Sequence, residues 1–217
     1  MTSKATRRFA AFAASVAWAA LLLQLWLTVN VVLGQGRGFA MGLVVYFGFF
    51  TVLTNVLAAV CLSAFAAGPR VSGHRVLTHA AVITTVTAAI TMVGLVYFFV
   101  LRHTWKPEGA QFAADAALHY AVPSLMLLFW LWVVPGGAVS RRAWPWLFVY
   151  PLVYLVYVFV RGEIFGIYPY FFIDVGQIGY GSALRNSLGV LVAYGAVVAL
   201  LIGLKHVFAR PLHAARP

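Results

Sequence analysis

The chain carries few charges, and negative charges are the scarcest. Only 9% of its 217 residues are charged and only four are acidic, whereas 64% are hydrophobic and the mean hydropathy is +0.95. This composition contains far more apolar surface than one water-soluble core could bury. It excludes an ordinary soluble globular protein, and it predicts that the surrounding solvent is lipid.

Cysteine and the common catalytic motifs are also nearly absent. The single cysteine, Cys61, excludes an internal disulfide and a CxxC metal site, and its place inside an apolar run predicts a buried structural thiol. The sequence contains no HExxH zinc motif, no phosphate-binding glycine loop and no GxSxG elbow. The spacing of His103, Glu108, Asp115 and His119 matches no standard metal site. We therefore expect neither a metal nor a cofactor.

What the chain does have is a series of apolar runs, each of the roughly 20 residues that a helix needs to cross a bilayer. The six predicted transmembrane helices cover residues 9–33, 41–67, 76–101, 113–134, 144–160 and 182–204. We therefore predict an all-α, polytopic membrane protein with one domain over residues 1–217. The run after the N-terminal basic cluster is too long for a signal peptide, which predicts a retained first helix. The aromatic segment 161–180 is expected to lie in the interface or to fold back into the membrane.

The distribution of basic residues predicts the orientation. With a cytoplasmic N-terminus, ten basic residues lie inside: Lys4, Arg7, Arg8, Arg70, Arg75, Arg141, Arg142, Lys205, Arg210 and Arg216. Five lie outside: Arg37, Arg102, Lys106, Arg161 and Arg185. This bias satisfies the positive-inside rule with both termini in the cytoplasm. The net charge of +11 thus indicates topology and contact with anionic membrane lipids, and we expect no nucleic-acid partner. All four acidic residues fall on the predicted outer side.

Polar residues inside two predicted spans are the candidates for chemistry. His119 lies within the fourth span, with Asp115 four residues earlier on the same helical face, and an acid beside a histidine favours a general base. In the second span, Thr51 and Asn55 also share a face. Thr51 can act as a nucleophile if a base lies within hydrogen-bond reach. The alternative is that these side chains only form interhelical or interfacial hydrogen bonds.

A third cluster follows the fifth span. Tyr150, Tyr154 and Tyr157 form a stripe that leads to Arg161, with Glu163 and Asp174 nearby. The tyrosines are expected either to anchor the helix or to line an acyl groove. Arg161 is expected either to pair with one of the acids or to hold a ligand carboxylate.

Five segments carry a resemblance to a known family. They are Tyr46 to Asn55 (YFGFFTVLTN), Leu118 to Pro123 (LHYAVP), Tyr150 to Tyr154 (YPLVY), Arg161-Gly162 and Tyr168-Pro169-Tyr170. Over nearly the whole chain they resemble the bacterial six-span membrane proteins named Pr-six-Pr. More distantly, the helix pattern, the histidine and the YP element are similar to the eukaryotic androgen-induced membrane proteins, which hydrolyse fatty acid esters of hydroxy fatty acids.

The resemblance implies a bacterial cytoplasmic membrane protein and an intramembrane threonine hydrolase acting on fatty-acyl esters. It implies His119 as general base and Thr51 as nucleophile, with Thr54 as the rival nucleophile and Asn55 in a supporting role. The alternative is a non-catalytic lipid-binding or transporter-like protein. Against transport, no predicted span has a clear glycine or proline interruption, and no inverted repeat is visible. The sequence does not distinguish a nucleophilic threonine from one that only packs, and it gives no oligomeric state.

Overall fold

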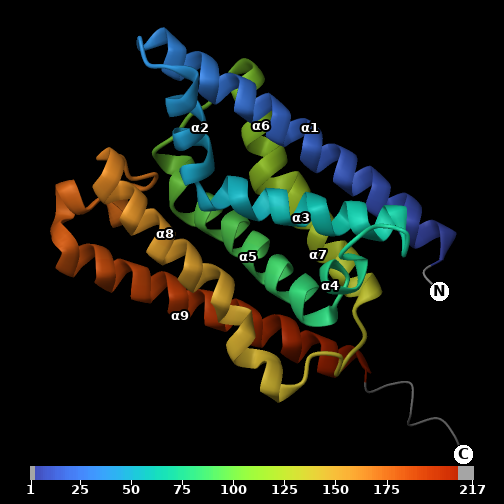
Figure 1. Ribbon diagram of the computed structural model, residues 1–217. Coiled ribbons are helices and arrows are strands. Elements are labelled where there is room, and N and C mark those ends of the chain that lie inside the picture. Colours follow the sequence, from blue (N-terminus) through green and yellow to red (C-terminus); the bar gives the residue numbers. More distant parts are fainter. Residues whose placement is uncertain (1–2, 210–217) are drawn as a thin grey trace, which may run out of the picture.

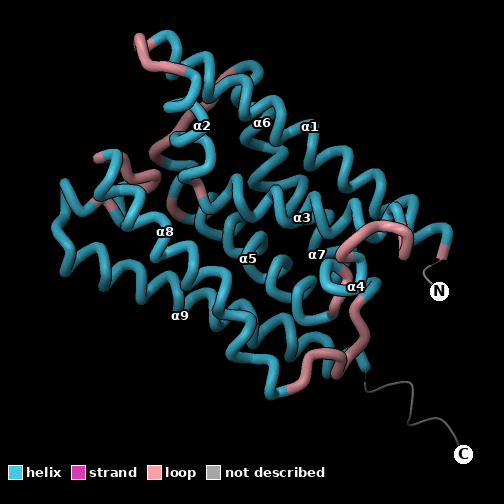
Figure 2. Tube along the Cα trace, in the orientation of Figure 1, coloured by secondary structure: helices cyan, strands magenta, loops and turns pink. Residues whose placement is uncertain are grey.

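The computed structural model describes residues 3–209, with side chains described for residues 3–205. Its helical elements, in chain order, are α1 (Lys4–Gly34), α2 (Phe39–Gly48), α3 (Phe50–Ala67), α4 (His74–Leu77), α5 (Ala80–Phe99), η1 (Leu101–His103), α6 (Gly109–Ala116), the π-helical turn η2 (Ala117–Ala121), α7 (Val122–Val133), η3 (Arg141–Phe148), α8 (Val149–Phe165), η4 (Phe171–Ile173) and α9 (Val175–Ala209). Figure 2 shows that helices joined by short loops make up the described chain.

Six of the helical stretches are long and apolar enough to cross a membrane, which confirms an all-α, multi-pass membrane protein. In Figure 1, α1 and α3 lie on one side of the bundle, α8 and α9 lie on the other, and α5 runs between them. Helix α5 packs against α3, α7 and α9, so it forms the centre of the core. With an even number of spans, α1 begins and α9 ends at the same end of the bundle (Figure 1).

The core is apolar and contains a few satisfied polar side chains. Ile83 and Ile90 of α5 are fully buried, and Trp130 of α7 is buried beside them and donates its indole N–H to Thr84. Cys61 is buried in α3, which confirms the predicted structural thiol. Burial of the Trp130 indole is tolerated because its N–H has a partner.

Several predicted boundaries differ from those observed. The third span begins at Ala80 because α4 forms a separate turn before it. The fifth continues to Phe165, past its predicted end at residue 160. Helix α9 begins at Val175, but it is kinked at Gly179, whose backbone angles are not helical (φ 72°, ψ 160°). The chain between the end of α8 and this kink therefore covers most of the predicted segment 161–180. Arg210 and Arg216 of the basic tail lie outside the described residues.

The prediction of one continuous helix over residues 41–67 is wrong. The second span is broken at Phe49, which has extended backbone angles (φ −80°, ψ 129°) between α2 and α3. The two pieces point in different directions in Figure 1. The expectation that no span is interrupted therefore fails at this position, although no proline is present to cause the break.

Side chains of α8 explain how the break is tolerated. The last carbonyls of a helix have no partner within the helix, and in lipid each must find one elsewhere. Arg161 donates from Nε and from a terminal nitrogen to the carbonyl of Val44, at 3.0 and 2.7 Å. Tyr154 donates to the carbonyl of Gly48, and Tyr157 donates to the carbonyl of Phe47. Polar groups of α8 thus cap the end of α2.

Candidate functional site

The break brings Thr51 into the first turn of α3, where it faces His119. The Oγ1 atom of Thr51 lies 3.4 Å from Nε2 of His119, although 68 residues separate them in sequence. Thr51 is only 7% exposed. The structure thus brings together the two residues predicted as nucleophile and base, within hydrogen-bond reach.

The other ring nitrogen of His119 fixes which nitrogen carries the proton. Nδ1 lies 2.9 Å from the backbone carbonyl of Asp115 and 3.4 Å from its carboxylate Oδ1. Because a carbonyl oxygen can only accept, the proton of a neutral imidazole must sit on Nδ1. Nε2 is then unprotonated and is free to accept a hydrogen bond from the hydroxyl of Thr51. Asp115 therefore orients the imidazole in the way a catalytic base requires.

A local defect in the helix helps to position His119. Residues 117–121 form the π-helical turn η2, which is followed by Pro123 in the first turn of α7. In a regular α-helix, the N–H of residue 123 would bond to the carbonyl of residue 119, but proline has no N–H. The freed carbonyl of His119 faces Gly94 of α5, where a Cβ atom would lie only 3.1 Å from it. Gly94 therefore permits α5 to approach the turn closely.

Two further side chains hold the pair in place. The ring of Tyr97 stacks on the imidazole of His119, with 4.1 Å between ring centroids and 20° between ring planes. The amide nitrogen of Asn55 donates to the carbonyl of Thr51 at 2.8 Å and to the carbonyl of Leu118 at 3.3 Å. Asn55 thus ties the first turn of α3 to η2, the two elements that carry the candidate nucleophile and the candidate base.

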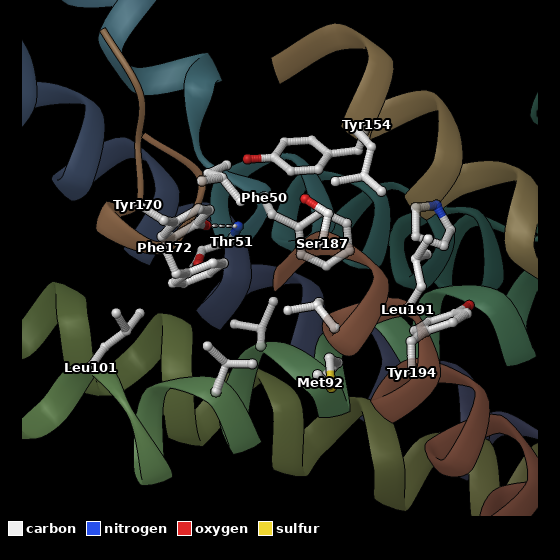
Figure 3. A pocket seen from close by; sticks show the side chains of 16 residues that line it. Phe50, Thr51, Met92, Leu101, Tyr154, Tyr170, Phe172, Ser187, Leu191 and Tyr194 are labelled. Carbon is white, nitrogen blue, oxygen red and sulfur yellow. Dashed lines mark hydrogen bonds between the residues drawn. The ribbon is translucent and has the colours of Figure 1, made fainter. Parts of the chain in front are cut away.

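Tyr170 covers the N-terminal end of α3. The backbone N–H of Thr51 donates to the hydroxyl of Tyr170 at 3.4 Å, as the dashed line in Figure 3 shows. Phe49, the N-cap residue of α3, makes no side-chain capping bond, so Tyr170 acts in its place. Burial raises the pKa of the Tyr170 hydroxyl above its ordinary value, and the hydroxyl therefore stays protonated and able to donate.

Thr51 stands on a wall shared by two cavities. The larger cavity, of about 540 Å³, lies on the His119 side and has a mixed lining. Its polar side chains are Gln24, Thr28, Gln35, Arg37, Thr51, Tyr97, Thr104, Gln111, Asp115, His119 and Tyr170. The smaller cavity, of about 70 Å³, is almost entirely apolar (Figure 3). Thr51, Leu101 and Tyr170 line both cavities. The candidate nucleophile is thus accessible from a polar side and from an apolar side.

The structure separates the two rival threonines. Thr54 is completely buried, and its hydroxyl lies 2.8 Å from the hydroxyl of Tyr150. Neither cavity is lined by Thr54, whereas both are lined by Thr51. Thr54 and Tyr150 therefore form a packing contact between α3 and α8, and the geometry favours Thr51 as the reactive residue.

The remaining predicted site residues do not reach Thr51 or His119. Arg161 is buried, and its guanidinium is bound to the carbonyls of Val44 and Ile167. Glu163 accepts a hydrogen bond from Tyr168, and Asp174 accepts one from Gln177. These contacts give Arg161 a role in capping α2, and they place both acids outside the two cavities.

Three residues of the site were not predicted to act there. The sequence marks Tyr170 only as part of the YP element, and it gives no sign that Tyr97 or Gly94 belongs to the site. Pro123 offered a usable signal, because it removes the hydrogen bond to the carbonyl of His119. No pattern in the sequence pairs Tyr97 with the imidazole. Within the part of the chain that the structure describes, no three His, Cys, Asp or Glu side chains come together as a metal site.

Comparison of the chain with protein-family models, with curated proteins and with solved structures finds no match. The resemblance to the six-span membrane proteins therefore stays a prediction.

Proposed function

We propose that this protein is an intramembrane hydrolase of fatty-acyl esters, with Thr51 as nucleophile and His119 as general base. One observation carries the proposal. The hydrogen bond from Nδ1 of His119 to a carbonyl leaves Nε2 unprotonated, and that atom faces the hydroxyl of Thr51. A hydroxyl next to an oriented base is the arrangement that covalent acyl transfer needs.

In the first half of the proposed reaction, Oγ1 of Thr51 forms a bond to the acyl carbon of the ester, and His119 takes the hydroxyl proton. The imidazolium then gives that proton to the leaving alkoxide as the ester C–O bond breaks, and an acyl group remains on Thr51. In the second half, His119 takes a proton from water, and the resulting hydroxide attacks the acyl carbon. The carboxylic acid leaves, and Thr51 regains its proton.

The negative charge that develops on the carbonyl oxygen needs donors near Thr51. The first turn of α3 supplies the positive end of a helix dipole at this point. The hydroxyl of Tyr170 adds a second donor, because it accepts from Thr51 and keeps its own proton. Asn55 serves to orient the pair, since its amide nitrogen already donates to two carbonyls.

The setting of the reaction is part of the same proposal. The resemblance to the bacterial six-span proteins and to the eukaryotic ester hydrolases supports a lipid substrate, with membrane lipids as the surroundings. The excess of basic residues in alternate loops supports a bacterial cytoplasmic membrane location with both termini inside.

The test is labelling of the purified protein in detergent with a lipophilic fluorophosphonate, which reacts with activated hydroxyl nucleophiles. We expect labelling of the wild type and of Thr54→Ala, and loss of labelling in Thr51→Ala and His119→Ala. Elution of each variant as a folded monodisperse species controls for misfolding. A folded wild type that takes no label would overturn the hydrolase and favour a lipid-binding protein that uses the same 540 Å³ cavity.

A further inference from the structure

The small cavity beyond Thr51 has a lining that suits one kind of occupant. It is lined by residues of α3, α5, η1, α8, η4 and α9, and its apolar residues include Met92 of α5 and Leu155 of α8. A cavity whose polar groups are all hydrogen-bonded within the protein stays dry and binds apolar molecules. Whether this cavity is of that kind depends on the hydrogen-bond partners of its hydroxyl groups.

Four of its five hydroxyl side chains have partners of their own. Tyr154 donates to Gly48, Tyr194 donates to Leu147, Ser187 donates to Ala183, and Tyr170 accepts from the backbone of Thr51. The fifth is the hydroxyl of Thr51, which lies 3.4 Å from the imidazole Nε2 of His119. The cavity therefore offers a ligand the hydroxyls of Thr51 and Tyr170 at one edge and hydrocarbon elsewhere.

The far end of the cavity is formed by one face of α9. Ser187, Leu191 and Tyr194 follow the spacing of a single helical face, and all three line the cavity. In Figure 3, Leu191 and Tyr194 lie across the view from Thr51 and Tyr170, with Ser187 between them. The seven helical steps from Ser187 to Tyr194 correspond to about 10 Å along the helix. Tyr194 is almost completely buried, so it closes this end.

We infer that the apolar cavity is the acyl-chain subsite of the ester hydrolase and that α9 sets the length of chain it accepts. This inference rests on the proposed function, because Thr51 links the cavity to the reaction. The acyl chain enters the apolar cavity, and the alcohol part of the ester lies in the larger polar cavity. The carbonyl carbon lies at Thr51, on the shared wall. Ser187 keeps the passage open, since a larger side chain there would project into it.

The test uses p-nitrophenyl esters from acetate to palmitate with the full chain in phosphatidylcholine nanodiscs. Ser187→Leu should lower kcat/KM for the decanoate ester about tenfold or more and leave the acetate ester within about twofold. Leu191→Ala should move the preference toward longer chains. The matched control is Gly189→Leu, which adds the same side chain to α9 where a Cβ atom meets nothing within 4 Å.

The outcomes separate this inference from the proposed function. Suppose that hydrolysis depends on Thr51 but that its chain-length profile is the same in the wild type, Ser187→Leu and Leu191→Ala. That result would overturn the acyl-chain subsite without contradicting the proposed hydrolase activity. If the wild type shows no Thr51-dependent hydrolysis, the proposed function fails. Binding of an acyl chain in the cavity is then tested by photo-cross-linking the protein with a fatty acid that carries a terminal diazirine. Cross-links on residues 187–194 that Ser187→Leu abolishes would support it, and cross-links elsewhere would overturn it.

Discussion

The guanidinium of Arg161 lies so close to Gly48 that a Cβ atom on Gly48 would come within 2.5 Å of its Cζ atom. Glycine is thus the residue that leaves room for a buried cation at the end of α2. The cation has no carboxylate partner among its hydrogen bonds and is held by the carbonyls of Val44 and Ile167. Its positive charge faces the negative end of the α2 dipole, which favours the arrangement.

Gly48→Ala should therefore destabilise the protein. The added methyl group displaces the guanidinium and leaves a buried charge with fewer partners, at a cost of about 3 kcal/mol. The thermal unfolding midpoint in detergent measures this loss. The matched control is Gly189→Ala, where no heavy atom lies within 4 Å of the new Cβ. Equal midpoints for the two variants would contradict the capping role of Arg161.

Gly94→Ala should impair the reaction more than it impairs stability. Its Cβ would lie 3.1 Å from the backbone carbonyl of His119 and would push η2 away from α5. At that distance the turn has to yield by a few tenths of an ångström. Because a misplacement of about 1 Å can cost about a hundredfold in rate, we expect this smaller shift to lower kcat for ester hydrolysis about threefold. Gly203→Ala, which meets nothing within 4 Å, serves as the control. Full activity in Gly94→Ala would show that η2 is not held in position by this contact.

Tyr170→Phe removes the acceptor of the Thr51 N–H and a donor near the reacting carbonyl. Loss of the cap should lower stability by about 1 kcal/mol, and loss of the donor should lower kcat with little change in KM. Denaturation in detergent and steady-state kinetics measure the two effects separately. A rise in KM at constant kcat would instead assign Tyr170 to substrate binding.

For the rival threonine, Thr54, we expect a loss of stability without a loss of labelling. Thr54 and Tyr150 share a hydrogen bond in the core, and neither contacts His119. Thr54→Ala and Tyr150→Phe should each lower stability by about 1 kcal/mol and keep fluorophosphonate labelling. In a double-mutant cycle, the two substitutions should be non-additive because they remove one interaction. Loss of labelling in a folded Thr54→Ala variant would instead identify Thr54 as the nucleophile.

The spans were predictable because hydropathy alone sets them. The predicted helices and the six observed membrane-crossing stretches agree in number, since a run of about 20 apolar residues has few alternatives in lipid. The relation of His119 to Asp115 was predictable for the same local reason, a separation of four residues on one helix. Both features depend only on residues that are neighbours along the chain.

The break at Phe49 was not predictable in this way. The segment around it, YFGFFT, has no proline, and its single glycine, Gly48, does not by itself end a helix within a long apolar run. What ends α2 is a set of donors on α8, and their position relative to α2 depends on the tertiary fold. The meeting of Thr51 with His119 depends on the break, so the pairing could be predicted only from the family resemblance. The roles of Tyr97 and Tyr170 were missed because their contacts also arise from the tertiary fold.

The broken second span has a consequence for how the protein matures. The side chains that hold the break stand far downstream. The donors Tyr154 and Arg161 lie 106 residues after Gly48 and 117 after Val44, and Tyr170, which accepts from the backbone of Thr51, lies 119 residues after it. When residues 39–67 first leave the ribosome and insert, none of these partners has been synthesised. A single unbroken helix then satisfies the most backbone groups. We therefore expect the newly inserted segment to rearrange within the membrane once α8 has inserted, so that Thr51 meets His119 only after the fifth span is in place.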